Sequence, residues 1–158
     1  MQRGYLVLTA FLGQLPEIMG QVSVTQQEGQ VTVEQGNAFE TTCTYETSYF
    51  RGLLWYKQKK SQGPQLLSNQ AIAGTKQGDR FTTELNITEK SSVPQLKEVE
   101  LSDSALYLCA VSDPRGRVSG SYNKVTFGSG TRLTVKPKVV PSPSVYRLTA
   151  KDDEDLEM

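Results

Sequence analysis

The chain has 158 residues, which is room for one ordinary domain and short flanking segments. Lysine plus arginine and aspartate plus glutamate number 17 each, and this balance argues against a nucleic-acid-binding protein with a basic excess. Histidine is absent, which excludes a Ser-His-Asp or Cys-His catalytic system built from this chain alone. A hydrolase with paired carboxylates is the remaining enzyme hypothesis, and no pair of carboxylates in the sequence is framed as a site.

The first twenty residues are typical of a secretory signal peptide. Arg3 gives a positive start, and residues 5–12 form an apolar run much too short to span a bilayer. Met19 and Gly20 offer a small residue at a cleavage point. We therefore expect residues 1–20 to direct the chain into the secretory pathway. A buried first strand or helix is the alternative. No later run approaches the ~20 apolar residues of a membrane helix, so no membrane anchor is expected in this chain.

From residue 21 onward the sequence alternates apolar and polar residues in short runs separated by turn residues. This period of two predicts strands, and the number of runs predicts an all-β sandwich in a domain of residues 21–136. The runs are residues 22–24, 31–33, 39–45, 53–58, 66–67, 81–87, 96–101, 105–111, 124–127 and 131–135.

The composition changes at Pro137. Residues 136–144 contain three prolines and predict an extended linker, and residues 145–148 resemble the first strand of another domain that then stops. Residues 151–158 carry five acidic residues and one lysine, and we expect them to be a solvated segment. The acidic run lacks the spaced ligands and the glycine of a calcium loop, and no metal or cofactor is expected.

Cys43, Trp55 and Cys109 are the most informative residues. Trp55 follows Cys43 by 12 residues and Cys109 follows Cys43 by 66. Two cysteines behind a signal peptide most simply form one disulfide. In an immunoglobulin variable-type sandwich with Greek-key connections, the two cysteines lie on facing sheets and a tryptophan packs against their bridge. Tyr107, two residues before Cys109, has the position of a tyrosine corner.

A short glycine-containing segment follows the last long loop. Phe127, Gly128, Ser129 and Gly130 precede an alternating run, whereas a dinucleotide-binding loop needs a third glycine and a following helix. We therefore expect a β-bulge in which the glycines adopt positive φ.

Three segments together resemble a T-cell receptor alpha chain: residues 55–58 (WYKQ), 103–111 (DSALYLCAV) and 127–135 (FGSGTRLTV) look like variable and joining segments, and residues 143–148 are similar to the start of an alpha constant domain. Phe127 in place of tryptophan sets aside the antibody heavy chain. The resemblance implies a partly buried ion pair between Arg80 and Asp103. Pro94 departs from the family pattern, and we expect its strand to be short, bulged or shifted.

The resemblance implies a binding protein without catalytic activity that contacts its ligand through three loops. The first loop is Thr47, Ser48, Tyr49, Phe50, Arg51 and Gly52; the second is Gln70, Ala71, Ile72, Ala73, Gly74 and Thr75; the third runs from Ala110 to Thr126 and includes Asp113, Arg115, Arg117, Tyr122 and Asn123. Arg115 and Arg117 are the expected ligand contacts, with solvated loop charge as the alternative. For Phe50 the alternative is packing back into the core.

The same resemblance implies two kinds of partner. A sheet face with Tyr56, Gln58, Pro64, Leu66, Tyr107 and Phe127 would pair with a T-cell receptor beta chain, and the loops would bind a peptide presented by an MHC molecule. CD3 signalling subunits would associate only through parts that this chain lacks, and the full-length receptor would lie at the plasma membrane with this domain outside. Asn86 begins a glycosylation sequon. The alternatives are another rearranged chain (delta or an antibody light chain) and a non-rearranged adhesion or co-receptor domain.

Overall fold

The computed structural model describes residues 22–27, 29–113 and 124–138. Three expectations fall outside this part of the chain: the signal peptide at residues 1–20, the segment from residue 139 onward, and the third-loop residues Arg115, Arg117, Tyr122 and Asn123.

Most of the alternating runs form strands, but the run at residues 96–101 does not: only Leu96 belongs to a strand, and Leu101 begins a short 3₁₀ turn. The strands at residues 74–77 and 91–96 were not predicted. The elements are β1 (Ser23–Gln26), β2 (Gln30–Glu34), β3 (Phe39–Glu40), β4 (Cys43–Glu46), β5 (Gly52–Gln58), β6 (Gln65–Gln70), β7 (Gly74–Gln77), β8 (Phe81–Asn86), β9 (Ser91–Leu96), η1 (Leu101–Asp103), β10 (Ala105–Asp113), β11 (Lys124–Phe127) and β12 (Thr131–Lys136).

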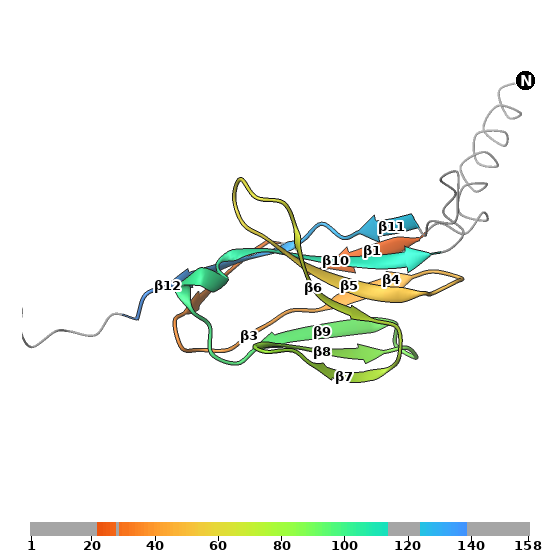
Figure 1. Ribbon diagram of the computed structural model, residues 1–158, viewed down its shortest axis with the longest axis horizontal. Helices are drawn as coiled ribbons and strands as arrows, with labels where there is room; N and C mark the ends of the chain where they lie inside the picture. Colours follow the sequence, from red (N-terminus) through yellow and green to blue (C-terminus); the bar gives the residue numbers. More distant parts are fainter. Residues whose placement is uncertain (1–21, 28, 114–123, 139–158) are drawn as a thin grey trace, which may run out of the picture.

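The strands make two sheets packed face to face (Figure 1). The first sheet has the order β1-β4-β9-β8-β7, with β3 also paired to β9; the second has the order β2-β12-β10-β5-β6, with β11 also paired to β10. The pairs are antiparallel except β12 with β2. The chain changes sheet five times, between β1 and β2, β2 and β3, β4 and β5, β6 and β7, and β9 and β10, so the connections are of the Greek-key kind. The predicted all-β variable-type sandwich is confirmed.

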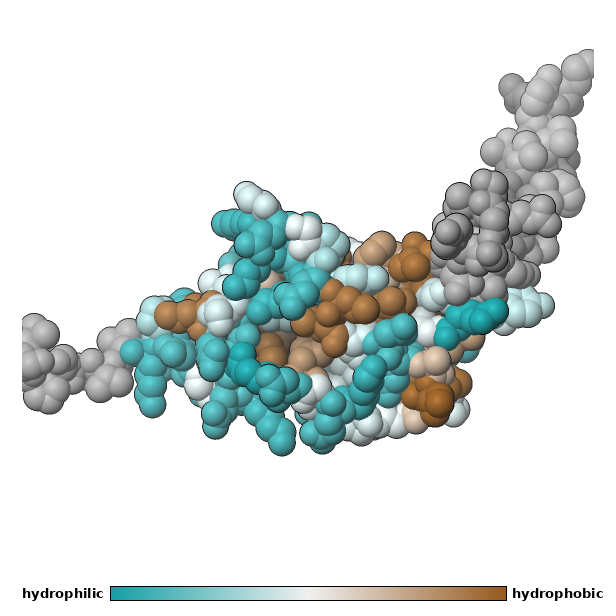
Figure 2. Space-filling view, viewed as in Figure 1, coloured by the Kyte–Doolittle hydropathy of each residue, from teal (hydrophilic) through white to brown (hydrophobic). Residues whose placement is uncertain are grey.

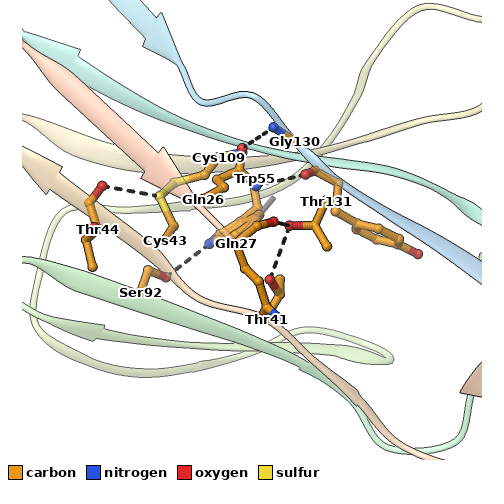
Figure 3. Close-up of a disulfide and its surroundings, with 11 residues drawn as sticks. Gln26, Gln27, Thr41, Cys43, Thr44, Trp55, Ser92, Cys109, Gly130 and Thr131 are labelled. Atoms are coloured by element: carbon orange, nitrogen blue, oxygen red, sulfur yellow. Dashed lines mark hydrogen bonds between the residues drawn. A yellow bond between two sulfur atoms is a disulfide. The ribbon is translucent and has the colours of Figure 1, made fainter. Parts of the chain in front are cut away.

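A disulfide and a tryptophan join the two sheets at the centre of the core (Figure 3). The Sγ atoms of Cys43 and Cys109 are bonded, as predicted, and both residues are fully buried. Trp55 lies opposite Cys109 in the second sheet and donates its indole Nε1–H to Ser92 Oγ at 3.0 Å, and Ser92 lies opposite Cys43 in the first sheet. The covalent bond and the hydrogen bond therefore connect the same two pairs of residues across the sandwich.

A buried glutamine that the sequence did not single out holds β1 against the second sheet. Gln26, which is 3% exposed, donates its Nε2–H to the carbonyl of Tyr107 at 2.9 Å. Its Oε1 accepts the backbone N–H groups of Cys109 at 3.0 Å and Gly130 at 2.9 Å. All three contacts satisfy backbone groups that would otherwise be buried without partners. The alternation in β1 marks this position, but it does not distinguish a buried glutamine from a surface one.

The glycine segment before β12 forms the expected bulge, and its two glycines are required for different reasons. The pairing with β10 shifts by one residue between Phe127, opposite Ala110, and Thr131, opposite Tyr107. Gly130 has φ of +89°, where an L side chain would be strained. Gly128 does not adopt positive φ, and that part of the prediction is wrong. Gly128 is needed for space, because a Cβ there would lie 2.5 Å from Gln26 Oε1.

Pro94 lies in an unbroken strand, which corrects the expectation of a short or shifted one. β9 pairs with β8 along its whole length without a register shift, and Pro94 is fully buried opposite Thr83. On its other side β9 pairs with β3 through Leu96 and Gln95 and with β4 through Ser92 and Ser91. Proline has no N–H to give to a ladder. The interruption therefore falls on the neighbouring run, which is split into β3 and β4.

Candidate functional site

The predicted binding loops lie at one end of the sandwich, to the right in Figure 1. The first loop joins β4 to β5, the second joins β6 to β7, and the third begins where β10 ends and finishes where β11 begins. Boundaries of all three predicted loops are wrong. The third loop was expected from Ala110 to Thr126, but residues 110–113 belong to β10 and residues 124–126 to β11. Gly52 is buried as the first residue of β5, and Gly74 and Thr75 are already in β7, so the second connection is only residues 71–73.

The second loop is held by a side chain beneath it. Gln70, at the end of β6 and 9% exposed, donates its Nε2–H to the carbonyls of Gly74 at 2.7 Å and Ile72 at 3.3 Å. Its Oε1 accepts the hydroxyl of Thr83 at 3.1 Å. Gln70 was predicted as the first residue of the second loop, but it is the last residue of β6 and supports the turn from below. Ile72 at the turn is 79% exposed and is the most exposed large apolar side chain among the described residues.

Aromatic residues of the first loop divide into one exposed and one packed ring. Tyr49 is 53% exposed, and its backbone N–H donates to Thr47 Oγ1 at 3.2 Å. Phe50 is half-buried and stacks on Tyr45 with ring centroids 4.7 Å apart. Burial raises the pKa of Tyr45, whose ring lies in the core. The structure therefore agrees with the alternative given for Phe50 in the sequence analysis, because its ring packs on the core and supports the loop.

Asp113 was predicted as a third-loop residue, but it is a buried strand residue, so that placement is wrong. It is the last residue of β10 and is 3% exposed. Its Oδ2 accepts the hydroxyl of Thr47 at 3.0 Å, and the carbonyl of Ser112 accepts the N–H of Arg51 at 3.0 Å. These bonds join the base of the first loop to the strand that leads into the third. Asp113 therefore positions the two loops relative to each other.

The outer face of the second sheet exposes apolar side chains. Phe127 on β11 is 48% exposed and contacts the half-buried Tyr56 of β5 with ring centroids 5.5 Å apart. Leu66 on β6 is 51% exposed, and Pro64 just before β6 is exposed. Figure 2 shows hydrophobic surface in the middle of this face, bordered by hydrophilic side chains. We refer to the outer face formed by Tyr56, Gln58, Pro64, Leu66 and Phe127 as the apolar sheet face.

Two predictions about the apolar sheet face need correction or addition. Tyr107 is 1% exposed and faces the core, because it alternates in β10 with residues that face outward. The half-buried Leu106 and Leu108 take its place. Gln58 lies on this face, but its Nε2–H donates to the carbonyl of Gln62 within its own hairpin at 3.1 Å. The alternation of β10 contained the signal for both leucines.

The structure brings Arg80 and Asp103 together at the opposite end of the sandwich. The guanidinium donates to both carboxylate oxygens, at 2.9 and 2.8 Å, and also to the carbonyl of Glu98 at 2.6 Å. The N–H of Glu100 donates to Asp103 Oδ2 at 2.7 Å. The hydroxyl of Tyr107 donates to the carbonyl of Asp103 at 2.7 Å, which is the bond of a tyrosine corner.

Lys57 is a third charge in this corner that the sequence did not indicate. Its Nζ lies 3.7 Å from Asp103 Oδ1. Burial lowers the pKa of Lys57 more than the charge of Asp103 raises it. Burial raises the pKa of Asp103. The hydrogen bonds from Arg80 and Glu100 and the charges of Arg80 and Lys57 together lower this pKa by more than burial raises it, so the net pKa shift is downward. Arg80 is therefore the effective partner of Asp103.

The described residues contain no group of three or more histidine, cysteine, aspartate or glutamate residues placed to hold a metal ion. In the same part of the chain, no helix is long and apolar enough to cross a membrane. The geometry consists of a loop end with exposed Tyr49 and Ile72, a separate apolar sheet face and a disulfide-linked core.

A comparison with known domain families agrees with this architecture. The family model of the immunoglobulin V-set domain matches residues 26–136. That span contains the disulfide, the tyrosine corner and the bulge before β12. The chain therefore belongs to the immunoglobulin V-set family.

Within that family, T-cell receptor alpha V regions are among the similar proteins. The chain is 40% identical to the T-cell receptor alpha chain V region CTL-F3 of Mus musculus over 117 residues, 73% of this chain and 83% of the relative. It is 36% identical to V region RL-5 of Oryctolagus cuniculus over 115 residues, 72% of this chain and 81% of the relative. A human segment named T cell receptor alpha variable 36/delta variable 7 is 31% identical over 105 residues, 66% of this chain and 93% of the relative. The resemblance to the T-cell receptor alpha family is confirmed.

Proposed function

We propose that this chain is the antigen-recognition subunit of an alpha–beta T-cell receptor, which binds a peptide presented by an MHC molecule when it is paired with a beta chain. It acts by binding and has no catalytic role. It follows the secretory pathway and works on the extracellular face of the plasma membrane in a full-length receptor. CD3 subunits would join through parts of the receptor outside the variable domain.

The observation that carries the proposal is the apolar sheet face. Leu66 and Phe127 each expose about half of their side-chain surface on the same side of the second sheet. An apolar patch of this kind, bordered by polar side chains, marks a protein–protein interface more often than a monomer surface. The residues of the apolar sheet face lie on β5, β6 and β11 or just before β6, whereas Tyr49 and Ile72 lie in the connections at the loop end. The domain can therefore contact a partner chain and a ligand at the same time.

The loop end supports the ligand half of the proposal. Tyr49 and Ile72 project from two connections whose bases are fixed by Thr47, Asp113 and Gln70. Exposed aromatic and apolar side chains on a rigid support give contact area at low entropic cost.

Pairing is tested by placing a charge on the apolar sheet face. Phe127→Asp and Leu66→Asp are each expected to weaken binding to a beta variable domain by about 2 kcal/mol or more, roughly thirtyfold in Kd. The cause is the burial of an unpaired carboxylate in the interface. Co-expressed chains would be captured through the beta chain, and the affinity measured by analytical ultracentrifugation.

The matched control for pairing is Leu101→Asp. Leu101 on η1 is 48% exposed, as Phe127 is, but it lies at the other end of the molecule. It should pair like the parent chain. Equal pairing of all three variants, or preference for an antibody heavy-chain variable domain over beta domains, would contradict the proposal. The human alpha/delta relative gives a reason to test delta-type partners in the same panel.

Ligand contact is tested by removing the two exposed side chains of the loop end. In a full-length version paired with a beta chain on cells, Tyr49→Ala and Ile72→Asp are each expected to lower ligand affinity by tenfold or more, about 1.4 kcal/mol. The readout is activation by cells presenting a peptide library on MHC molecules, followed by binding of the selected complex. Gln77→Ala, on the exposed strand β7, is the control and should change neither. Loop-mediated recognition would be contradicted if Tyr49→Ala, Ile72→Asp and the double variant Arg115→Ala, Arg117→Ala all kept the response of the parent chain.

A further inference from the structure

The glycosylation sequon lies on a turn at the loop end. Asn86 is the last residue of β8 and is exposed, and Ile87 and Thr88 follow it in the turn to β9. Asn86 Oδ1 accepts the N–H of Glu89 at 3.0 Å. Asn86 Nδ2 has no hydrogen-bond acceptor among the described residues. The side chain is therefore held by its oxygen, with the amide nitrogen toward solvent.

Strand pairing sets this turn beside both of the first two loops. Asn86 lies opposite Ser91 of β9, and Ser91 lies opposite Thr44 of β4, so Asn86 is about 10 Å from the strand that enters the first loop. On the other side of β8, Leu85 lies opposite Gly74 of β7. The preceding residue, Ala73 of the second loop, therefore lies about 5 Å from Asn86. Lys90 Nζ, in the same turn, lies 3.0 Å from Glu46 Oε2, next to the first loop.

The side chain of Asn86 points away from the apolar sheet face. In β8, Phe81, Thr83 and Leu85 face the core, so Glu84 and Asn86 face outward from the first sheet. The apolar sheet face belongs to the second sheet, on the other side of the core. A group attached at Asn86 would therefore flank the loop end without meeting a partner on the apolar sheet face.

We propose that Asn86 carries an N-linked glycan that shields the first-sheet side of the loop end, so that a protein ligand approaches the loops from above or from the side of the second sheet. In the attachment step Asn86 Nδ2 forms a bond to the anomeric carbon of a lipid diphosphate-linked oligosaccharide in the secretory pathway. The bond from that carbon to the diphosphate oxygen breaks, the lipid diphosphate leaves, and the amide nitrogen loses one proton. The sequon at Asn86 is the only one in the 158 residues, so a single substitution removes the glycan.

The first part of the test measures occupancy. The chain is secreted from mammalian cells with a beta chain, and its intact mass is compared before and after treatment with peptide N-glycosidase. The parent chain and Thr88→Ser, which keeps the sequon, should both lose one glycan mass. Thr88→Ala, which keeps Asn86 but not the sequon, should lose none. Absence of a glycan on the exported parent chain would overturn the proposal.

The second part measures shielding without any ligand, and it uses a cysteine introduced by Ala73→Cys. Its reaction rates with a small maleimide and with a polyethylene glycol maleimide are compared. Loss of the glycan by Thr88→Ala should raise the large-to-small rate ratio several-fold, whereas Thr88→Ser should leave it unchanged. Ser102→Cys, exposed on η1 at the far end of the sandwich, should give the same ratio in all three backgrounds.

An occupied site with an unchanged ratio at Ala73→Cys would also overturn the proposal. The proposal rests on the proposed function only in naming this end as the ligand-binding one. Both measurements, the glycan occupancy and the maleimide reaction rates, are made in the absence of ligand. A failure to find peptide–MHC binding would therefore leave these results intact and count against the proposed function alone.

Discussion

Replacing Cys43 and Cys109 together with alanine is expected to lower the free energy of unfolding by about 4 kcal/mol, on the chain-entropy model of disulfide stabilisation. The bond closes a loop between residues 66 positions apart, and its loss frees that whole segment in the unfolded chain. A domain of this size is stable by only ~5–15 kcal/mol. The variant should therefore be partly unfolded at 37 °C or exported poorly.

Trp55 makes this prediction simple to measure, because it is the only tryptophan in the chain. Its fully buried indole lies beside the bridge, so its fluorescence reports on the region that the substitution affects. Urea unfolding should show a midpoint shifted to lower concentration in the double variant. Ser92→Ala is the matched control, since it removes only the hydrogen bond from Trp55 and should cost about 1 kcal/mol. Equal midpoints for the parent chain and the double variant would contradict the prediction.

The sequence predicted the parts of the fold that depend on spacing. Cys43, Trp55, Tyr107 and Cys109 must meet at fixed register positions in two facing sheets, and only a few spacings allow this. The alternation of apolar residues added the strands. Because these features are characteristic spacings and short alternating patterns, they could be recognised in the sequence without knowing which strand pairs with which.

The sequence did not predict which polar residues are buried. Gln26, Gln70 and Asp113 look like ordinary surface or loop residues, and their burial depends on hydrogen-bond partners that come near only after folding. The third-loop prediction for Asp113 failed for this reason. Its partner Thr47 lies 66 positions earlier, and no local pattern links the two.

The predictions for Tyr107 and Pro94 were wrong for different physical reasons. Tyr107 was placed on the apolar sheet face although its position as a tyrosine corner requires it to point inward. Pro94 was expected to disrupt its own strand, but a strand has two neighbours, and the break fell on the β3–β4 side. The split of a neighbouring run cannot be read from the strand that contains the proline.

Arg80→Ala is expected to cost about 3 kcal/mol of unfolding free energy, at the lower end of the range for breaking a buried pair because Arg80 itself is partly exposed. The substitution leaves the 3% exposed carboxylate of Asp103 without its two guanidinium bonds. Arg80→Lys should restore only part of the loss, since an ammonium cannot make two parallel bonds. The measurement is urea unfolding at pH 7, again followed by Trp55.

Lys57→Met serves as the contrast in the same corner. Because burial lowers the pKa of Lys57 despite the nearby carboxylate, its charge gains little from Asp103. Replacement by an apolar side chain of similar length should change stability by less than about 1 kcal/mol. A loss as large as that of Arg80→Ala would mean that the two cations share Asp103 equally.

The pH dependence separates the ionised pair from packing. The folded-state pKa of Asp103 is lower than its ordinary value, so the pair stabilises the fold fully at a pH above the unfolded-state pKa of about 4. That stability is lost as the pH falls through the lower, folded-state pKa. The difference in unfolding free energy between the parent chain and Asp103→Asn should therefore be constant from about pH 5 to 7 and shrink below about pH 4. A difference that stays constant down to pH 2 would assign the effect to packing and hydrogen-bond geometry, because the lost charge would then contribute nothing.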